Sequence, residues 1–232
     1  MTYPAAADPF AVNTAASVHI EQVGASCPVL VIDDFYADPQ AVRALALGGN
    51  YDSSLAYYPG LHARIDDALI QPLFEHLATL LRQLGHAQVR AEALFSDFSI
   101  VTTPAKQMLA KQKHPHIDGL PLAGVVYLSP ELEVGTAFFE HRPLGLSMLR
   151  NADEMERYDA WLRQQGQSTQ PDTYAVEDGT VWVKLHAVAG RFNRMVMYPG
   201  NAFHSIDMRD VPASQTLASA RLTQRLFLGA LN

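Results

Sequence analysis

The sequence predicts an α+β protein whose β part is a sandwich or a jelly roll. Two helical patterns lie within residues 38–85, and seven short segments rich in β-branched and aromatic residues follow them. Gly, Pro, Asp or Asn separates most of these segments and favours turns between strands. A doubly wound α/β protein would instead alternate its strands with helices. The chain has 232 residues, 48 % of them hydrophobic, which suits one large domain with a core of its own.

Charge and cysteine content exclude several classes of protein. The chain has 17 Lys and Arg against 24 Asp and Glu, a formal net charge of −7, whereas nucleic-acid-binding domains usually show a basic face. The single cysteine, Cys27, allows no disulfide within the chain. The chain starts with neither a basic nor an apolar signal region, and its apolar stretches fall far short of the roughly 20 residues that span a membrane. We therefore expect a cytoplasmic protein with neither nucleic acid nor membrane as a partner; the oligomeric state stays open.

The first elements are read from composition and from capping residues. Residues 1–16, rich in Ala with scattered Pro, predict a flexible tail ahead of a single domain over residues 17–232. The apolar run 28–35 predicts a buried strand. Residues 38–49 predict a helix, because Asp38 can cap its start and two glycines can end it.

The remaining elements alternate loops, helices and strands. The stretch 50–64 has turn residues and no regular period, which predicts a loop, and residues 66–85 predict a helix with leucines along one face. Residues 145–179 predict an insertion between strands, with a helix over 153–166. The predicted strands are 93–103, 122–130, 135–141, 180–186, 193–199, 201–206 and 221–230.

The triplet His116-Ile117-Asp118 is the first candidate for chemistry. In an extended segment alternate side chains share a face, so His116 and Asp118 would lie about 6.5 Å apart on one side of the backbone. Two ligands at that spacing can bind one small cation. By itself an H-x-D triplet is a weak signal in a chain with nine histidines.

His204 is the natural third ligand. It follows the turn Pro199-Gly200-Asn201 and lies in a short apolar strand. Two histidines and one carboxylate form a facial triad that leaves coordination positions open, and this ligand set is typical of non-haem Fe(II) oxygenases.

The order of these motifs resembles that of the Fe(II)- and 2-oxoglutarate-dependent oxygenases with a double-stranded β-helix. Within that superfamily the chain looks most like the prolyl-hydroxylase-like branch and resembles a poorly characterised bacterial family of it. The resemblance covers most of residues 28–230. The matching stretches are VIDDFYADPQAVRALAL, YYPGLHA, KHPHIDGLPLAGVVYLSPELEVGTAFFEHR, FNRMVMYPGNAFHS and RLTQRLFLGA.

The resemblance implies a fold, a metal and a set of ligands. The fold would be a cupin-like jelly roll, the double-stranded β-helix, with supporting helices on one face. His116, Asp118 and His204 match the Fe(II) ligands. These three residues are also the catalytic residues that the resemblance implies.

The resemblance also implies a binding site for 2-oxoglutarate as cosubstrate. Arg221 matches the basic residue that opens the last core strand, and its planar guanidinium can hold a carboxylate by two hydrogen bonds. Tyr127 resembles a tyrosine whose hydroxyl often supports the same carboxylate. Thr223 lies two residues after Arg221, hence on the same strand face, and can add a second hydroxyl.

Three features depart from the family pattern. Val134 stands where a glycine commonly precedes Gly135. The step of 17 positions from His204 to Arg221 is longer than usual. Arg225 is a second cation on the same strand face as Arg221, and it could compete for 2-oxoglutarate or reach an anion of the substrate.

We therefore predict an Fe(II)- and 2-oxoglutarate-dependent dioxygenase that uses O₂ to oxidise, most simply to hydroxylate, an amino-acid, peptidyl or small-molecule substrate. Two alternatives stay open: a non-catalytic jelly-roll module that binds a small molecule, and a cupin-like metalloenzyme that does not use 2-oxoglutarate. The irregular stretches 50–64 and 145–179 are candidates for a lid over the substrate.

Overall fold

Two antiparallel sheets and three α-helices make up the chain in the computed structural model, which describes residues 8–24, 27–53, 59–84, 95–165, 173–175, 179–211 and 216–229. The large sheet has the order β1-β2-β8-β5-β10-β4-β3 and the small sheet the order β7-β6-β9. The strands of the large sheet are β1 (Ser17–Val23), β2 (Cys27–Asp33), β3 (Leu61–Arg64), β4 (Phe95–Val101), β5 (Leu122–Tyr127), β8 (Met195–Pro199) and β10 (Arg221–Leu228). Those of the small sheet are β6 (Thr136–His141), β7 (Trp182–Val188) and β9 (His204–Ile206).

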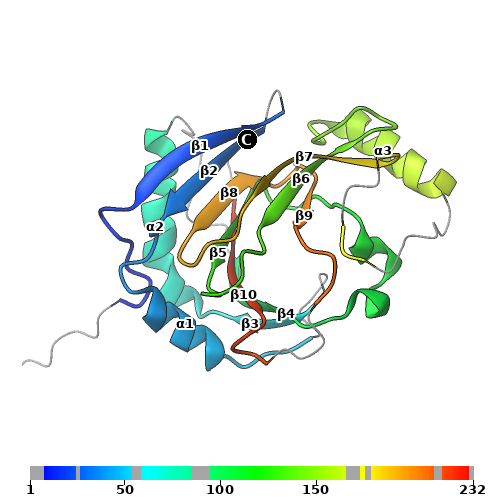
Figure 1. Ribbon diagram of the computed structural model, residues 1–232. Helices are drawn as coiled ribbons and strands as arrows, with labels where there is room; N and C mark the ends of the chain where they lie inside the picture. The colour runs from blue at the N-terminus through cyan, green and yellow to red at the C-terminus, as the bar shows by residue number, and fades with distance from the viewer. Residues whose placement is uncertain are drawn as a thin grey trace, which may run out of the picture.

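The helices lie on the outer faces of the two sheets. Helices α1 (Pro39–Leu47) and α2 (Asp67–Gln83) flank the large sheet, while α3 (Ala152–Gln165) lies beside the small sheet (Figure 1). Two short 3₁₀ turns, Ala105–Gln107 and Ala110–Lys113, precede β5. The α+β class that the sequence predicts is therefore confirmed. None of the helices in the described ranges is long and apolar enough to cross a bilayer.

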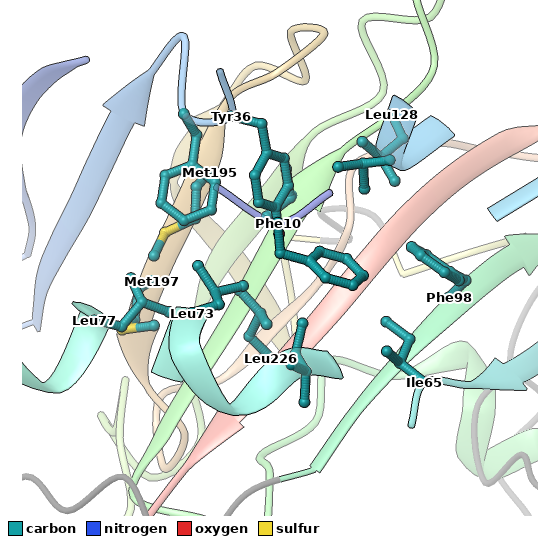
Figure 2. Packing of buried hydrophobic residues seen from close by; sticks show 14 of the residues in the cluster. Phe10, Tyr36, Ile65, Leu73, Leu77, Phe98, Leu128, Met195, Met197 and Leu226 are labelled. Carbon is teal, nitrogen blue, oxygen red and sulfur yellow. The ribbon is translucent and has the colours of Figure 1, made fainter. Parts of the chain in front are cut away.

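Alternation along the central strands separates two cores. Met195 and Met197 of β8 and Leu226 of β10 point toward α2, where they pack with Leu73 and Leu77 (Figure 2). The intervening residues of the same strands point to the other face, because successive side chains of a strand alternate. That other face is apolar next to β2 and polar along β10, and the functional residues gather on its polar part.

A second core joins the two sheets. Tyr127, Val196 and Tyr198 of the large sheet pack with Phe138 and Val188 of the small sheet. Apolar burial of this kind contributes roughly 25 cal/mol per Å². It holds the small sheet over the large one and leaves room for a cavity beside this core.

Aspartates cap the N-termini of α1 and α2, as the sequence predicts for Asp38. The carboxylate of Asp38 accepts a hydrogen bond from the backbone N–H of Ala41 at 3.0 Å and caps α1. The carboxylate of Asp66 accepts one from the N–H of Ala68 at 2.8 Å and caps α2. Gly85, the predicted end of α2, lies outside the described residues, and Leu84 occupies the C-cap.

Two strands at opposite edges of the large sheet are missing from the sequence prediction. Among the described strands, β1 pairs only with β2, and its first four residues are exposed. Strand β3 falls inside the stretch 50–64, for which the sequence predicts a loop. That prediction is wrong for these four residues. The pairing of β3 with β4 makes it a strand, and such a long-range pairing leaves little trace in local composition.

The predicted flexible tail is wrong from residue 8 onward. Phe10 is only 2 % exposed and packs against Tyr36 and Phe98 in the helix-side core (Figure 2). Val12 forms a β-bridge with Tyr36. An aromatic ring that enters the core fixes a segment whose composition is otherwise typical of a mobile terminus.

The segment 145–179 lies between β6 and β7, and part of it belongs to the core. Leu146 and Leu149 are buried against the outer face of the small sheet, and Tyr158 of α3 packs against Phe203 with ring centroids 4.9 Å apart. Residues 166–172 and 176–178 lie outside the described residues.

Candidate metal centre

The two histidines of the predicted triad are joined through their backbones. His116 forms an antiparallel bridge with His204 of β9: the N–H of His116 donates to the carbonyl of His204 at 3.0 Å, and the reverse bond measures 2.9 Å. Their rings lie with centroids 4.3 Å apart. Two residues 88 positions apart in the chain therefore share one local framework.

Asp118 is positioned by the turn that precedes β9. Its N–H donates to the carbonyl of Gly200 at 2.6 Å, while the N–H of Gly200 donates to the carbonyl of Pro121 at 2.8 Å. A Cβ on Gly200 would lie 2.0 Å from the carbonyl oxygen of Leu120 and 3.3 Å from the Cβ of Asp118. Only glycine lets the two loops approach closely enough to make these hydrogen bonds.

The three side chains converge on one point. Their donor atoms all lie within 4.8 Å of one another. The Nε2 atom of His204 is 3.3 Å from Oδ2 of Asp118, and Nε2 of His116 is 3.9 Å from Oδ1 of the same carboxylate. A set of two imidazoles and one carboxylate at these distances is the donor set that suits a divalent transition metal with open positions.

The ring of His204 is held for coordination through its far nitrogen. Its Nδ1 lies 2.9 Å from the carbonyl oxygen of Ala202, an acceptor, which assigns the proton to Nδ1. The lone pair is then on Nε2, the atom that faces Asp118. A second hydrogen bond of this kind fixes the tautomer and the orientation of metal-binding histidines.

Burial and neighbouring charges keep the ligands in their deprotonated forms. Burial, together with the charge of His204, lowers the pKa of His116 to about 3. For Asp118 burial acts to raise the pKa, but the neighbouring imidazole of His204 holds the pKa of the carboxyl below its ordinary value. At neutral pH a metal ion thus meets a neutral His116 imidazole and an ionised Asp118 carboxylate.

A cavity of about 410 Å³ opens in front of the three ligands. Its walls come from β4, β5, β8 and β10 of the large sheet and from β6 and β9 of the small sheet. Among the described residues, neither 50–64 nor 145–179 contributes to its lining, so the predicted lid segments find no support here. Residues 54–58, within the first of these segments, lie outside the described residues.

Two of the three residues predicted to hold 2-oxoglutarate, Arg221 and Thr223, line this cavity. Arg221 and Thr223 of β10 and Thr136 of β6 line it. Arg221 is 7 % exposed, and its Nε–H donates to the carbonyl of Val134 at 3.3 Å. A cation and two hydroxyls on one wall can bind a carboxylate.

Tyr127 lies one layer behind that wall. It does not line the cavity; the guanidinium carbon of Arg221 is 5.6 Å from the centroid of its ring. Its hydroxyl is 2.8 Å from Oγ1 of Thr136. Burial raises the pKa of Tyr127, so the hydroxyl stays protonated. Tyr127 thus supports the two lining residues and does not itself reach the cavity.

The partners of Arg225 are not predicted by the sequence. Its Nε and Nη2 donate to the two oxygens of Asp97 at 2.7 and 2.5 Å, and Nδ1 of His62 lies 3.2 Å from the same carboxylate. Asp97 and His62 are almost fully buried. The alternating pattern of β4 could have placed Asp97 on the cavity side of the sheet, but no local signal links it to Arg225, 128 positions away.

Comparisons with known proteins add a family and one distant neighbour. The crystal structure of the non-heme alpha ketoglutarate dependent epimerase SnoN from nogalamycin biosynthesis is 16 % identical and covers 87 % of this chain and 76 % of its own. Its TM-score is 0.46, too low to support an argument about function. No curated protein matches the chain.

A family model gives the firmer result. The model described as "Family of unknown function (DUF6445)" matches residues 14–228, nearly the whole of the described structure. The chain belongs to this family of unknown function.

Proposed function

We propose that the protein is an Fe(II)- and 2-oxoglutarate-dependent dioxygenase built on a double-stranded β-helix. The observation that carries the proposal is the convergence of His116, Asp118 and His204 at one end of a cavity whose wall contains the guanidinium of Arg221. The donor set fits Fe(II), because it supplies two neutral nitrogens and one anionic oxygen and leaves positions for other ligands. The two sheets would then be the major and minor sheets of the jelly roll.

The chain's own residues would bind the metal and 2-oxoglutarate, orient them and shield the reacting groups from water. His116, Asp118 and His204 would hold the metal, and Arg221 would bind the distal carboxylate of 2-oxoglutarate with help from the hydroxyls of Thr136 and Thr223. When bound, Fe(II) and 2-oxoglutarate supply the oxidation of a substrate C–H bond by O₂. The apolar lining, which includes Ala123, Val125 and Phe227, would exclude water from the reacting groups.

Tyr127 has a positioning role in this proposal. Its ring lies against the guanidinium of Arg221, and its hydroxyl is hydrogen-bonded to Thr136. It would fix the direction of the two groups that contact the cosubstrate. The substrate would be an amino-acid or peptidyl side chain or another small molecule that the cavity can hold.

The test combines metal binding with turnover. The protein is loaded with Fe(II) without oxygen, 2-oxoglutarate is added, and succinate is measured after exposure to O₂, with and without candidate substrates. We expect one metal per chain, binding of 2-oxoglutarate and formation of succinate. His116→Ala should weaken metal affinity more than about 100-fold, because it removes a ligand and not merely a supporting contact.

Two variants make the result specific. His76→Ala changes an exposed histidine of α2 and should leave metal binding unchanged. Arg221→Gln should leave metal binding unchanged and weaken the binding of 2-oxoglutarate. Metal binding without any affinity for 2-oxoglutarate would point to a cupin-like enzyme of another class, whereas binding of both without succinate would point to a non-catalytic module.

A further inference from the structure

A second guanidinium faces the cavity and has no part in the function proposed above. Arg221, Thr223 and Arg225 alternate along β10 and point to the same face of the large sheet. Arg225 is four residues beyond Arg221, about 13 Å along the strand. Arg221 donates to the carbonyl of Val134 and Arg225 to Asp97, so the two guanidinium groups are held by different partners and Arg225 is available for a different anion.

One edge of the Arg225 guanidinium is used by the protein. Nε and Nη2 donate side by side to the two oxygens of Asp97. Asp97 is 1 % exposed and has His62 on its other side, itself fully buried. The carboxylate is thus enclosed between two partners, so it can aim the guanidinium but cannot reach the cavity.

The other edge of the guanidinium remains for a ligand. A guanidinium carries five N–H groups, and the edge formed by Nη1 and Nη2 is not used by any partner among the described residues. The side chain is 21 % exposed and lines the cavity. Its guanidinium carbon lies 5.6 Å from the ring of Phe227, which covers one face and leaves the edge accessible.

The two guanidinium groups are held at different places in the site. Arg221 donates to the carbonyl of Val134 and lies over the ring of Tyr127, whereas Arg225 donates to Asp97. Arg225 lines the same cavity as His116 and Asp118, so an anion that it binds would share that cavity with the metal ligands.

The buried ion pair is not explained by stability alone. Replacing a buried pair by apolar residues of similar volume is often neutral or stabilising. Here an acid and a histidine lie buried behind an arginine, and the neighbours of that arginine in the cavity wall include Val125 and Phe227. What the network does supply is a fixed direction for the guanidinium on the cavity wall.

We propose that Arg225 binds a carboxylate of the prime substrate and that Asp97 and His62 position it for this task. This inference rests on the dioxygenase proposed above and names its substrate class: small molecules that carry a carboxylate, such as free amino acids. A planar, singly charged group matches the remaining guanidinium edge by two hydrogen bonds. A doubly charged group fits less well, because Asp97 already balances the charge of Arg225.

The experiment compares acids with their amides. The L-amino acids and their primary carboxamides are titrated against the protein loaded with Mn(II) and 2-oxoglutarate without oxygen, and against the protein alone. At least one acid should bind about 10-fold or more tightly than its amide, the fold-change expected for a charge-assisted hydrogen bond. Arg225→Gln should lower the affinity for that acid to the affinity for its amide. The affinities for Mn(II) and 2-oxoglutarate should change by about twofold or less.

A second variant guards against misfolding. Arg225→Gln leaves Asp97 buried without its cation, so Asp97→Asn with Arg225→Gln removes both charges together and should show the same loss of preference. The inference is overturned if no acid binds better than its amide, or if the preference survives both changes. If the protein prefers acids through Arg225 but binds neither Mn(II) nor 2-oxoglutarate, the carboxylate site is supported and the dioxygenase proposal is contradicted.

Discussion

Gly200 links the metal site to the backbone around it. It contributes no side chain, yet its carbonyl accepts the N–H of Asp118, and its Cα faces the carbonyl of Leu120 at a distance that admits no Cβ. The position of the carboxylate thus depends on a residue outside the ligand set. The sequence indicates a turn at this point but not the close approach, because the neighbouring loop is some 80 positions earlier.

Adding one methyl group tests this dependence. Gly200→Ala should push the loop that carries Asp118 away, lower the free energy of unfolding by about 1–3 kcal/mol and weaken metal binding about 10-fold or more. The measurements are chemical denaturation and equilibrium dialysis with a divalent metal. Gly119→Ala is the matched control, since a Cβ there meets nothing within 4 Å. Equal metal affinity for the two variants would contradict the positioning role of Gly200.

The same scale shows what spacing can predict about the site. The triplet His116-Ile117-Asp118 fixes two donors through the geometry of an extended chain, and the turn before His204 indicates the third. The ion pair of Arg225 with Asp97 has no such signal, because its two partners meet only through the register of β10 on β4. Local pattern therefore predicts ligands within a segment, whereas contacts across the sheet need the fold.

At the scale of elements, prediction succeeds where a segment is buried on both faces or capped. Strands β2, β5 and β8 are apolar runs at the centre of the sheet, and α1 and α2 begin at aspartate caps. Prediction fails at the edge strand β1, whose exposed residues give only a weak apolar pattern. It also fails at β3, whose four residues form a strand only because β4 lies alongside.

An ion pair joins the end of β2 to the residue that precedes β8, and it makes stability depend on pH. Arg194 donates to both oxygens of Asp33 at 2.7 and 3.0 Å, and these hydrogen bonds hold the pKa of Asp33 below its ordinary value although burial acts the other way. Because the pKa is lower in the folded state, the stabilisation is present above the unfolded-state pKa of about 3.9 and is lost as the pH falls through the folded-state value.

Asp33→Asn should therefore lower the free energy of unfolding by about 1–2 kcal/mol at pH 7, and the difference from the unchanged protein should shrink below about pH 4. Urea unfolding between pH 3 and 7 measures it. Asp67→Asn removes the acid of a much more exposed pair with Arg64, and should change stability by about 0.5 kcal/mol or less at every pH. A constant difference for Asp33→Asn across the range would show that its charge is not the cause.

At the scale of the whole molecule, the N-terminal segment is part of the helix-side core. Phe10 lies between Tyr36 and Phe98, so the segment closes the end of the layer between α2 and the large sheet. Composition suggests a tail here because Ala and Pro are frequent in mobile termini. The burial of one ring decides otherwise, and only the assembled core reveals it.

Truncating that ring should cost much of the protein's stability. Phe10→Ala removes a side chain that is 2 % exposed and should lower the free energy of unfolding by about 3–5 kcal/mol, with a matching fall in the melting temperature. Val18→Ala, at a residue 42 % exposed on β1, should cost about 0.5 kcal/mol or less. If Phe10→Ala leaves the free energy of unfolding nearly unchanged, the segment is a tail and not part of the core.

The backbone bridge between His116 and His204 determines how a cation would be captured. Peptide groups, not an ion, keep the donors together, so the conformational entropy of assembling them is lost when the chain folds. The protein would therefore stay folded after a chelator removes the cation. The cation would bind to a site that is already formed in the folded protein. Ligand exchange, without any refolding step, would then govern the lifetime of the bound ion.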